Sequence, residues 1–288
     1  MNKHLVLLSL LMIIALTGCT KPSTDLPTGT VPSQVAYPAE KSAPPTAIPT
    51  KHTLTVFAAA SLTGAFQEIG KDYETTNPGV NVSFNFAGSQ ILRTQLEQGA
   101  AADVFSSADH KNMDFLVTEN LVDENTYQDF ATNKLTVVLP AGNPGNVQTL
   151  EDLARPNLKL ILADSSVPAG NYARQILTNM SEAPMYGADF SEKVLANVVS
   201  NETDVKQVVT KVELGEADAG IVYISDAIAA PDLITISIPN EFNVTAKYPI
   251  AVLTNAPEPK LAEAFIAYIL SPAGQAVLNK WGFSPKEH

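Results

Sequence analysis

The sequence predicts an α/β protein whose mainly parallel sheets are flanked by helices. Strand-like and helix-like segments alternate along nearly the whole chain after residue 52, which is typical of parallel sheets covered on both faces. Residues 53–288 are enough for two lobes of ordinary size. In open sheets of this class, ligands lie outside the carboxyl ends of the strands, where the chain turns into helices. We therefore expect a ligand site at such junctions.

The N-terminal residues carry the features of an exported protein. An apolar run over residues 5–16 follows one lysine, which predicts a signal peptide over residues 1–18. The ending Leu16-Thr-Gly-Cys19 resembles a bacterial lipobox, which implies cleavage before Cys19, its lipidation, and an extracytoplasmic protein anchored to the membrane. Residues 19–52 hold seven prolines among Ser, Thr and Ala, and predict a disordered tether. Cys19 is the only cysteine, so no intramolecular disulfide can form.

The first strand-to-helix junction begins the folded part of the chain. Residues 54–58 are expected to form a buried strand, and small alanines allow a tight turn. Ser61 occupies an N-cap position before apolar residues at helical spacing. Alternating apolar residues predict a strand over residues 80–87, and a helix follows from Ser89 towards Gly99.

The rest of the chain continues the alternation of strands and helices. Further strands are expected at residues 102–107, 134–139, 158–163, 219–224, 233–238 and 249–253. Further helices are expected at residues 111–117 and 150–154, after Gly170, from Val205 to Val212, and at residues 259–269 and 272–280.

Four junctions share one pattern that favours an anion site. They lie at Ser61, Ser89, Ala169 and Val205, where a strand or loop turns into a helix. A helix N-terminus offers unpaired amide N–H groups and the positive end of the helix dipole. A lone serine at such a place is usually only a cap. If two lobes face each other, however, four such termini can converge on one anion.

Bulk charge and histidine content argue against several functions. The net charge of −12 argues against nucleic acid as a partner and against binding to an anionic membrane surface. Only His110 of the four histidines lies inside the expected fold, Ser61 lacks the Gly-x-Ser-x-Gly context of a hydrolase, and no Cys–His cluster suits zinc. Asp103 and Asp109 are expected to be a cap and a solvated residue. We therefore expect no enzyme, no metal cation and no cofactor.

Six segments of the chain form a recognisable series: Val56-Phe-Ala-Ala-Ala-Ser-Leu62, Phe86-Ala-Gly-Ser89, Ala102-Asp-Val-Phe-Ser-Ser-Ala-Asp109, Val167-Pro-Ala-Gly170, Asp204-Val205 and Gly220-Ile-Val-Tyr223. Together, and in this order, they resemble the periplasmic molybdate-binding protein of bacterial ABC importers. The resemblance runs from about residue 54 to residue 283. It implies a type II periplasmic binding protein fold with mixed, mainly parallel sheets and a ligand cleft between two lobes. Lobe 1 would hold residues 53–131 plus 248–288, and lobe 2 would hold residues 132–247.

The resemblance also implies the ligand, its contacts and the partners. The ligand would be molybdate or tungstate, held without a metal cation. Its contacts would be hydroxyl and amide groups of Ser61 and Ser89, amides of Ala169 and Val205, and the Tyr223 hydroxyl. Partners would be a membrane permease and its ATPase, and we expect a monomer that closes by hinge bending.

Other ligands remain to be weighed against molybdate. An organic acid would call for an arginine fork and ferric iron for clustered tyrosines, of which only Tyr172 and Tyr223 are near. Sulfate stays open, because it asks for the same neutral donors and the sequence does not report the size of the cleft. Asp204 would repel a dianion if it turned inward, and we expect it to cap its helix and point away.

Overall fold

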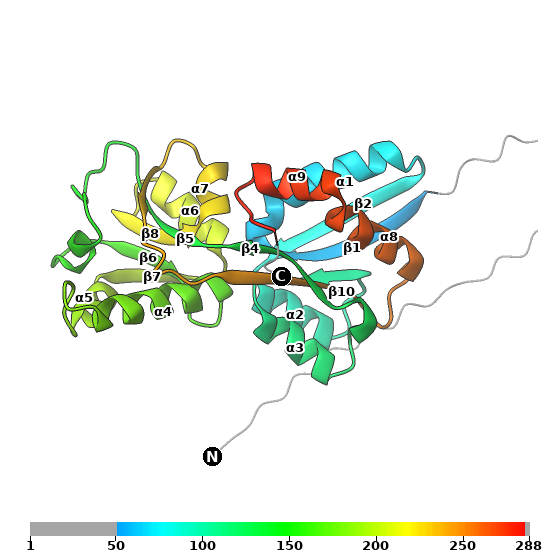
Figure 1. The fold of residues 1–288 in the computed structure, drawn as a ribbon, viewed down its shortest axis with the longest axis horizontal. Coiled ribbons are helices and arrows are strands. Elements are labelled where there is room, and N and C mark those ends of the chain that lie inside the picture. The colour runs from blue at the N-terminus through cyan, green and yellow to red at the C-terminus, as the bar shows by residue number, and fades with distance from the viewer. Residues whose placement is uncertain (1–50, 286–288) are drawn as a thin grey trace, which may run out of the picture. The chain divides into compact units, whose positions relative to one another are not determined.

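The computed structural model describes residues 51–285, which belong to one compact unit. The expected signal peptide (1–18), the lipid attachment site Cys19 and nearly all of the expected tether (19–52) lie outside the described residues. Two five-stranded sheets, each flanked by helices, make two lobes, as the alternation of strands and helices predicts (Figure 1). The lobe boundaries expected at residues 131/132 and 247/248 stay a prediction.

Lobe 1 contains a sheet with the strand order β2-β1-β3-β10-β4. Its strands are β1 (His52–Ala59), β2 (Val80–Ala87), β3 (Val104–Ser106), β4 (Gln128–Asn133) and β10 (Ala246–Val252). The pairs β1–β2 and β1–β3 are parallel, whereas β10 is antiparallel to both β3 and β4. A strand from the end of the chain therefore lies between two strands from its first half.

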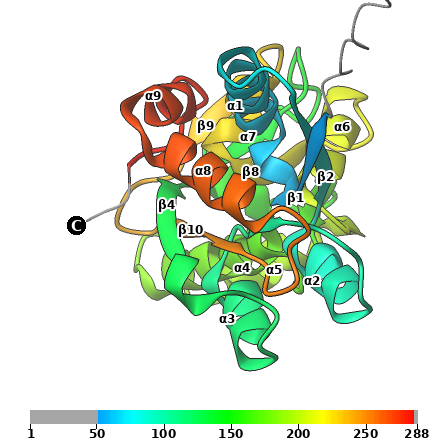
Figure 2. The ribbon, with the colours of Figure 1, turned by 90° about the vertical axis from the view of Figure 1, so that its right-hand side faces the viewer.

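Helices cover both faces of this sheet, with α1, α8 and α9 on one side and α2 and α3 on the other (Figure 2). Their bounds are α1 (Thr63–Thr76), α2 (Ser89–Glu97), α3 (His110–Thr118), α8 (Pro259–Leu270) and α9 (Pro272–Lys280). Two 3₁₀ turns, η1 (Ala60–Leu62) and η2 (Glu124–Thr126), complete the lobe. In the lobe's core, Phe66 packs against the rings of Phe84, Phe130 and Phe265.

Lobe 2 contains a sheet with the strand order β7-β6-β8-β5-β9. Its strands are β5 (Leu135–Leu139), β6 (Leu160–Ala163), β7 (Val198–Glu202), β8 (Ala219–Tyr223) and β9 (Ile234–Ser237). The pairs of β6 with β7 and β8 are parallel, and the pairs of β5 with β8 and β9 are antiparallel. Both sheets are therefore mixed.

Helices also cover both faces of the second sheet, α4 and α5 on one and α6 and α7 on the other (Figure 1). Their bounds are α4 (Pro168–Glu182), α5 (Phe190–Ala196), α6 (Val205–Glu213) and α7 (Ile224–Ala229), with a 3₁₀ turn η3 (Glu151–Ala154). Val205, Val208, Val209 and Val212 are buried along one side of α6, as their spacing predicts.

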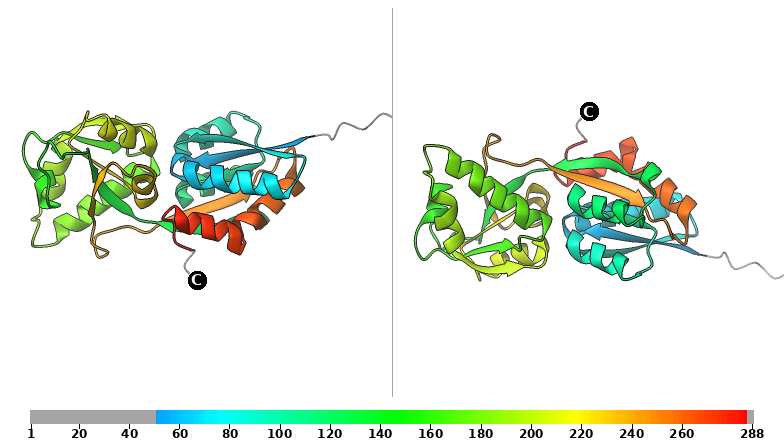
Figure 3. Two further views of the ribbon diagram at one scale, coloured as in Figure 1. Left: turned by 90° about the horizontal axis from the view of Figure 1, so that it is seen from above. Right: turned by 90° about the horizontal axis from the view of Figure 1, so that it is seen from below.

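Two chain segments join the lobes, one between β4 and β5 and one between β9 and β10 (Figure 3). Asn243 of the second segment bonds to the start of β5, since its side chain accepts a hydrogen bond from Leu135 N at 3.1 Å and donates one to Leu135 O at 2.8 Å. The Lys134 ammonium also donates to Asn240 Oδ1 at 2.8 Å. These bonds hold the two segments side by side, which suits a paired hinge.

Within residues 51–285, no single helix combines the length and the apolar composition needed to cross a membrane, and the bent pair α8–α9 meets both criteria only when its two helices are taken together.

Candidate functional site

A small cavity lies where the two lobes meet, at the carboxyl ends of strands. Its volume is about 10 Å³, far below the roughly 300–1,000 Å³ of a pocket for a drug-sized molecule. All five expected contact residues line it. The full lining is Ala59, Ala60, Ser61, Gly88, Ser89, Ala108, Val167, Pro168, Ala169, Val205 and Tyr223.

Three helices from two lobes begin at this cavity. Ser89 is the first residue of α2, Ala169 the second of α4, and Val205 the first of α6. The amides of a helix's first turn have no acceptor within the helix, and the helix dipole places partial positive charge there. Three of the four expected helix N-termini therefore border one cavity, whereas Ser61 reaches it from a 3₁₀ turn. Such an arrangement of helix N-termini is typical of anion sites.

The Ser89 hydroxyl is held in one orientation by the backbone. Ser89 Oγ accepts a hydrogen bond from Ala108 N at 3.0 Å, and the side chain is buried. An amide can only donate, so the hydroxyl hydrogen of Ser89 remains available for a third group. The hydroxyl can therefore donate to an acceptor in the cavity that Ser89 and Ala108 both line.

Ser61 lies at the cavity, but it does not cap α1, although its place in the sequence predicts a cap. Residues 60–62 form the turn η1, α1 starts only at Thr63, and no side-chain cap bond is formed at either start. The Ser61 hydroxyl instead lies 2.9 Å from the Tyr248 hydroxyl of β10. This long-range bond competes with capping, because the same oxygen cannot face both partners.

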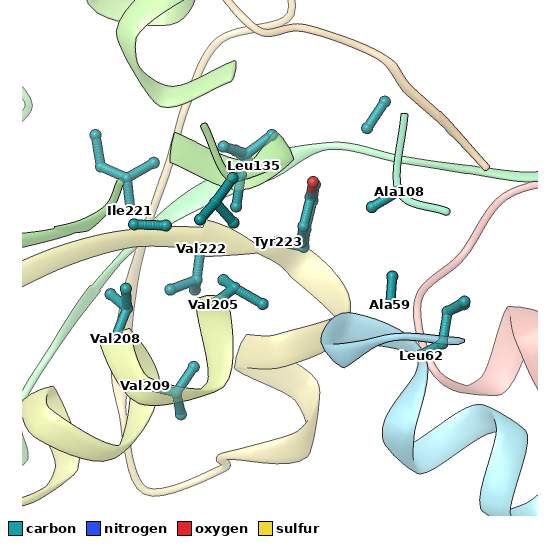
Figure 4. Close-up of a cluster of buried hydrophobic side chains, with 14 of the residues drawn as sticks. Ala59, Leu62, Ala108, Leu135, Val205, Val208, Val209, Ile221, Val222 and Tyr223 are labelled. Atoms are coloured by element: carbon teal, nitrogen blue, oxygen red, sulfur yellow. The ribbon is translucent and has the colours of Figure 1, made fainter. Parts of the chain in front are cut away.

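Tyr223 ends β8 and brings a phenol to the cavity from lobe 2. Figure 4 shows its ring between Val205 of its own lobe and Ala59 and Ala108 of lobe 1, which line the same cavity. The residue is 1% exposed, and its hydroxyl has no hydrogen-bond partner within the described residues. Burial raises the pKa of the phenol well above its ordinary value, so it stays a protonated donor. A buried hydroxyl without a partner indicates a place for a ligand acceptor.

The cavity carries no charged side chain among the described residues that line it, all eleven of which are neutral. Asp204, which precedes α6, accepts hydrogen bonds from Gln207 N at 3.1 Å and from Gln207 Nε2 at 2.7 Å. It caps its helix, as expected, and is not part of the lining. Lys206 lies 3.1 Å from the buried carboxylate of Asp226, so a counter-charge compensates its own charge.

A direct hydrogen bond joins the lobes beside the cavity. Gln90 Nε2 in α2 donates to Thr203 O of lobe 2 at 2.8 Å. The approach is close at Gly88, where an added Cβ would lie 2.6 Å from the same Thr203 oxygen. Gly88 has φ −58° and ψ 139°, an ordinary extended conformation, so the need for glycine here is steric and comes from the opposite lobe.

Several parts of this site have no signature in the local sequence. Tyr248 gave no local signal, because it lies 187 residues from Ser61. Gln90 and Thr203 are 113 residues apart, so no local pattern indicates that they pair. Ala59 and Ala60, which line the cavity, belong to the run of small residues before Ser61. That run is a usable signal, since small side chains let main-chain amides reach a ligand.

The acidic residues considered for catalysis have structural roles. Asp103 accepts hydrogen bonds from Thr55 N and Glu258 N, both at 2.7 Å, and so joins three segments of lobe 1. Asp109 is the N-cap of α3, where it accepts from Asn112 N at 3.0 Å. The expectation of a solvated residue is wrong, because Asp103 is 1% and Asp109 is 6% exposed. His110 Nε2 lies 2.6 Å from Asp129 Oδ1, and neither residue lines the cavity. No group of three or more His, Cys, Asp or Glu residues in the described range is arranged to hold a metal ion.

Comparisons with known proteins agree with this geometry. A family model described as bacterial extracellular solute-binding protein matches residues 54–284. The molybdate-binding protein ModA of Mycobacterium tuberculosis is 41% identical over 233 residues, which is 81% of this chain and 84% of the relative. A Bacillus subtilis protein named "Putative ABC transporter substrate-binding lipoprotein YvgL" is 31% identical over 235 residues, 81% of this chain and 87% of the relative.

The fold itself matches a solved structure. The periplasmic molybdate-binding protein of Azotobacter vinelandii aligns with a TM-score of 0.71 and 22% identity, covering 81% of this chain and 100% of that one. The expected two-lobed periplasmic binding protein fold is therefore confirmed. Because the family model and the mycobacterial relative both cover most of the sequence, this chain belongs to the molybdate-binding protein ModA family of bacterial extracellular solute-binding proteins.

Proposed function

We propose that this protein captures molybdate, or its analogue tungstate, outside the cytoplasm and delivers it to an ABC importer. The observation that carries the proposal is the convergence of neutral donors from both lobes on one small cavity with an uncharged lining. A fully ionised tetrahedral oxyanion offers only acceptors, so hydroxyl and amide donors suffice, and a carboxylate, which only accepts, would have no hydrogen to bind. The 41% identity to a protein named for molybdate binding supports this choice of anion.

The five lining residues named from the sequence are proposed as the ligand contacts. Ser61 and Ser89 would donate through hydroxyl and amide groups, Ala169 and Val205 through amides, and Tyr223 through its phenol. Each charge-assisted hydrogen bond contributes about 1.5–3 kcal/mol. Because the donors come from both lobes, bending at the two connecting segments would complete the set and enclose the ion.

The proposed partners are a membrane permease with its ATPase, and the lipid bilayer. The lipobox ending at Cys19 and the lipoprotein name of the Bacillus relative support an anchor at that residue. Replacing Cys19 by alanine should abolish labelling of the protein by a radioactive fatty acid in the cell. A Cys19→Ala protein that is still labelled would contradict the anchor. We propose that the soluble part acts as a monomer.

Isothermal titration of the purified protein with molybdate, tungstate, sulfate and phosphate tests the ligand. Molybdate and tungstate should bind tightly and with similar affinities, sulfate more weakly, and phosphate most weakly. Sulfate is the second candidate ligand, because it is also a proton-free dianion and needs the same neutral donors of Ser61, Ser89 and Tyr223. Binding of sulfate as tight as or tighter than that of molybdate would overturn the molybdate assignment.

A further inference from the structure

A buried hydroxyl stands behind the cavity without lining it. Tyr248 of β10 is fully buried, and its Oη lies 2.9 Å from Ser61 Oγ. Its ring is fixed by perpendicular packing against Phe130 and Phe283, with ring centres 6.3 and 5.2 Å away. Burial raises the pKa of this phenol well above its ordinary value, despite the opposing hydrogen bond to Ser61. The group therefore keeps its proton at any physiological pH.

The two hydroxyls share one hydrogen bond. Its direction decides whether Ser61 presents its hydrogen or a lone pair to the cavity. If Tyr248 donates, Ser61 keeps its own hydrogen free to donate to a ligand. If Ser61 donates, its lone pairs face the ligand and the Tyr248 hydrogen is buried without an acceptor. Ser61 makes no other hydrogen bond in the described part of the chain, and the further hydroxyl beside Tyr248 is that of Tyr223, whose ring centre lies 5.8 Å from that of Tyr248 and which makes no hydrogen bond of ordinary geometry. An unpaired buried donor is costly. The first direction is therefore favoured.

We propose that Tyr248 is a positioning residue that holds Ser61 as a hydrogen-bond donor towards the anion, and so disfavours oxyanions that carry a proton. This inference rests on the proposed function, because it concerns the same cavity. The Ser89 hydroxyl also accepts a hydrogen bond from a neighbour, and the direction of this bond is fixed, because its partner, the Ala108 amide, can only donate. Ser61 differs because its partner is a hydroxyl, which can donate or accept. The orientation of Ser61 thus depends on one side chain.

The consequence concerns ligand selection between tetrahedral anions. Molybdate and sulfate need donors only, whereas hydrogen phosphate also carries a hydroxyl that needs an acceptor. Without the Tyr248 hydroxyl, Ser61 can rotate and accept that hydrogen.

Tyr248→Phe tests this inference in a titration against molybdate, sulfate and hydrogen phosphate. The Tyr248–Ser61 bond is present with and without ligand, and Ser61 keeps its own hydrogen, so affinity for molybdate and sulfate should fall only about threefold, the cost of fixing a free hydroxyl, with their ratio unchanged. Affinity for hydrogen phosphate should rise, because Ser61 can then accept its hydrogen, so the molybdate-to-phosphate ratio should drop about tenfold. Tyr73→Phe, another buried tyrosine of lobe 1, is the matched control and should change neither ratio. Thermal unfolding of each variant checks that it is folded.

Repeating the substitution in a Ser61→Ala protein separates the role of Tyr248 from a general disturbance of the fold. In a Ser61→Ala protein Tyr248 has no hydroxyl to orient, so adding Tyr248→Phe should leave the molybdate-to-phosphate ratio unchanged. A parallel fall for all three anions, or no change, would refute the role of Tyr248 while leaving molybdate capture intact. If the wild-type protein binds sulfate and not molybdate, the proposed function fails, but the sulfate-to-phosphate ratio still tests Tyr248.

Discussion

Replacing Gly88 by alanine should weaken anion binding without harming the fold. The Gly88 backbone has φ −58° and ψ 139°, which alanine adopts freely, so the free protein should be as stable as the wild type or slightly more stable. The added methyl group would meet lobe 2, however, where Thr203 O lies 2.6 Å from the position of the new Cβ. The substitution therefore acts mainly on the closed arrangement of the lobes.

The size of the effect follows from this distance. Ordinary contact begins at 3.4 Å, so lobe 2 must retreat by about 0.8 Å, the difference between 3.4 and 2.6 Å. A hydrogen bond of about 2.9 Å that is lengthened by this amount is no longer a hydrogen bond. An anion held by lobe 1 would lose at least one donor from Ala169 or Val205, at about 1.5–3 kcal/mol. We expect the dissociation constant to rise roughly 10- to 100-fold.

Isothermal titration measures the affinity, and small-angle scattering with and without molybdate measures the closure. Gln90→Ala and the double variant Gly88→Ala/Gln90→Ala are the controls, because the new Cβ would also lie 2.5 Å from the flexible Gln90 side chain. If the double variant binds as well as Gln90→Ala alone, the clash is with that side chain and the reasoning from Thr203 is refuted. Normal affinity and normal closure of Gly88→Ala would refute it as well.

Three further substitutions test the site and its support. Ser61→Ala should weaken molybdate binding tenfold or more in a calorimetric titration, because it removes a donor and leaves the Tyr248 hydroxyl unpaired; unchanged affinity would contradict a contact. Burial raises the pKa of Glu202, but hydrogen bonds from Lys211 and a serine outweigh this and lower it overall. Its stabilisation is therefore present above the unfolded-state pKa and lost as the pH falls through the folded one. In urea denaturation Glu202→Gln should cost about 1–3 kcal/mol at pH 7, with the loss shrinking below about pH 4; a pH-independent loss would argue against this. Phe66→Ala should lower the free energy of unfolding by about 3–5 kcal/mol and leave the affinity of the folded protein unchanged; a loss below 1 kcal/mol would show that the core repacks.

Local patterns in the sequence predicted much of the fold. The apolar spacing of α6, the Asp204 cap and the end of α2 before Gly99, which has φ +87°, all depend on neighbours within a few residues. The expectation of a binding protein and not an enzyme is confirmed by family membership. These successes have one physical origin, because side-chain periodicity and capping are local.

The missed elements are short or defined by distant partners. β4 has the polar sequence Gln-Asp-Phe-Ala-Thr-Asn and becomes a strand through its pairing with β10. α5, β7 and α7 have only seven, five and six residues, too few for a clear period. Ser61 fails as a cap for a similar reason, since its partner lies in the last strand. Local propensity does not carry such information.

The position of β10 determines which of the two sheets can be completed first during synthesis. Every strand of lobe 2 lies between Leu135 and Ser237, so that sheet can assemble as soon as this stretch has been synthesised. The other sheet is incomplete until Val252 is available, because β10 fills the gap between β3 and β4. The half that begins first along the chain is thus finished last, and a product cut short before β10 would expose an open edge on both β3 and β4.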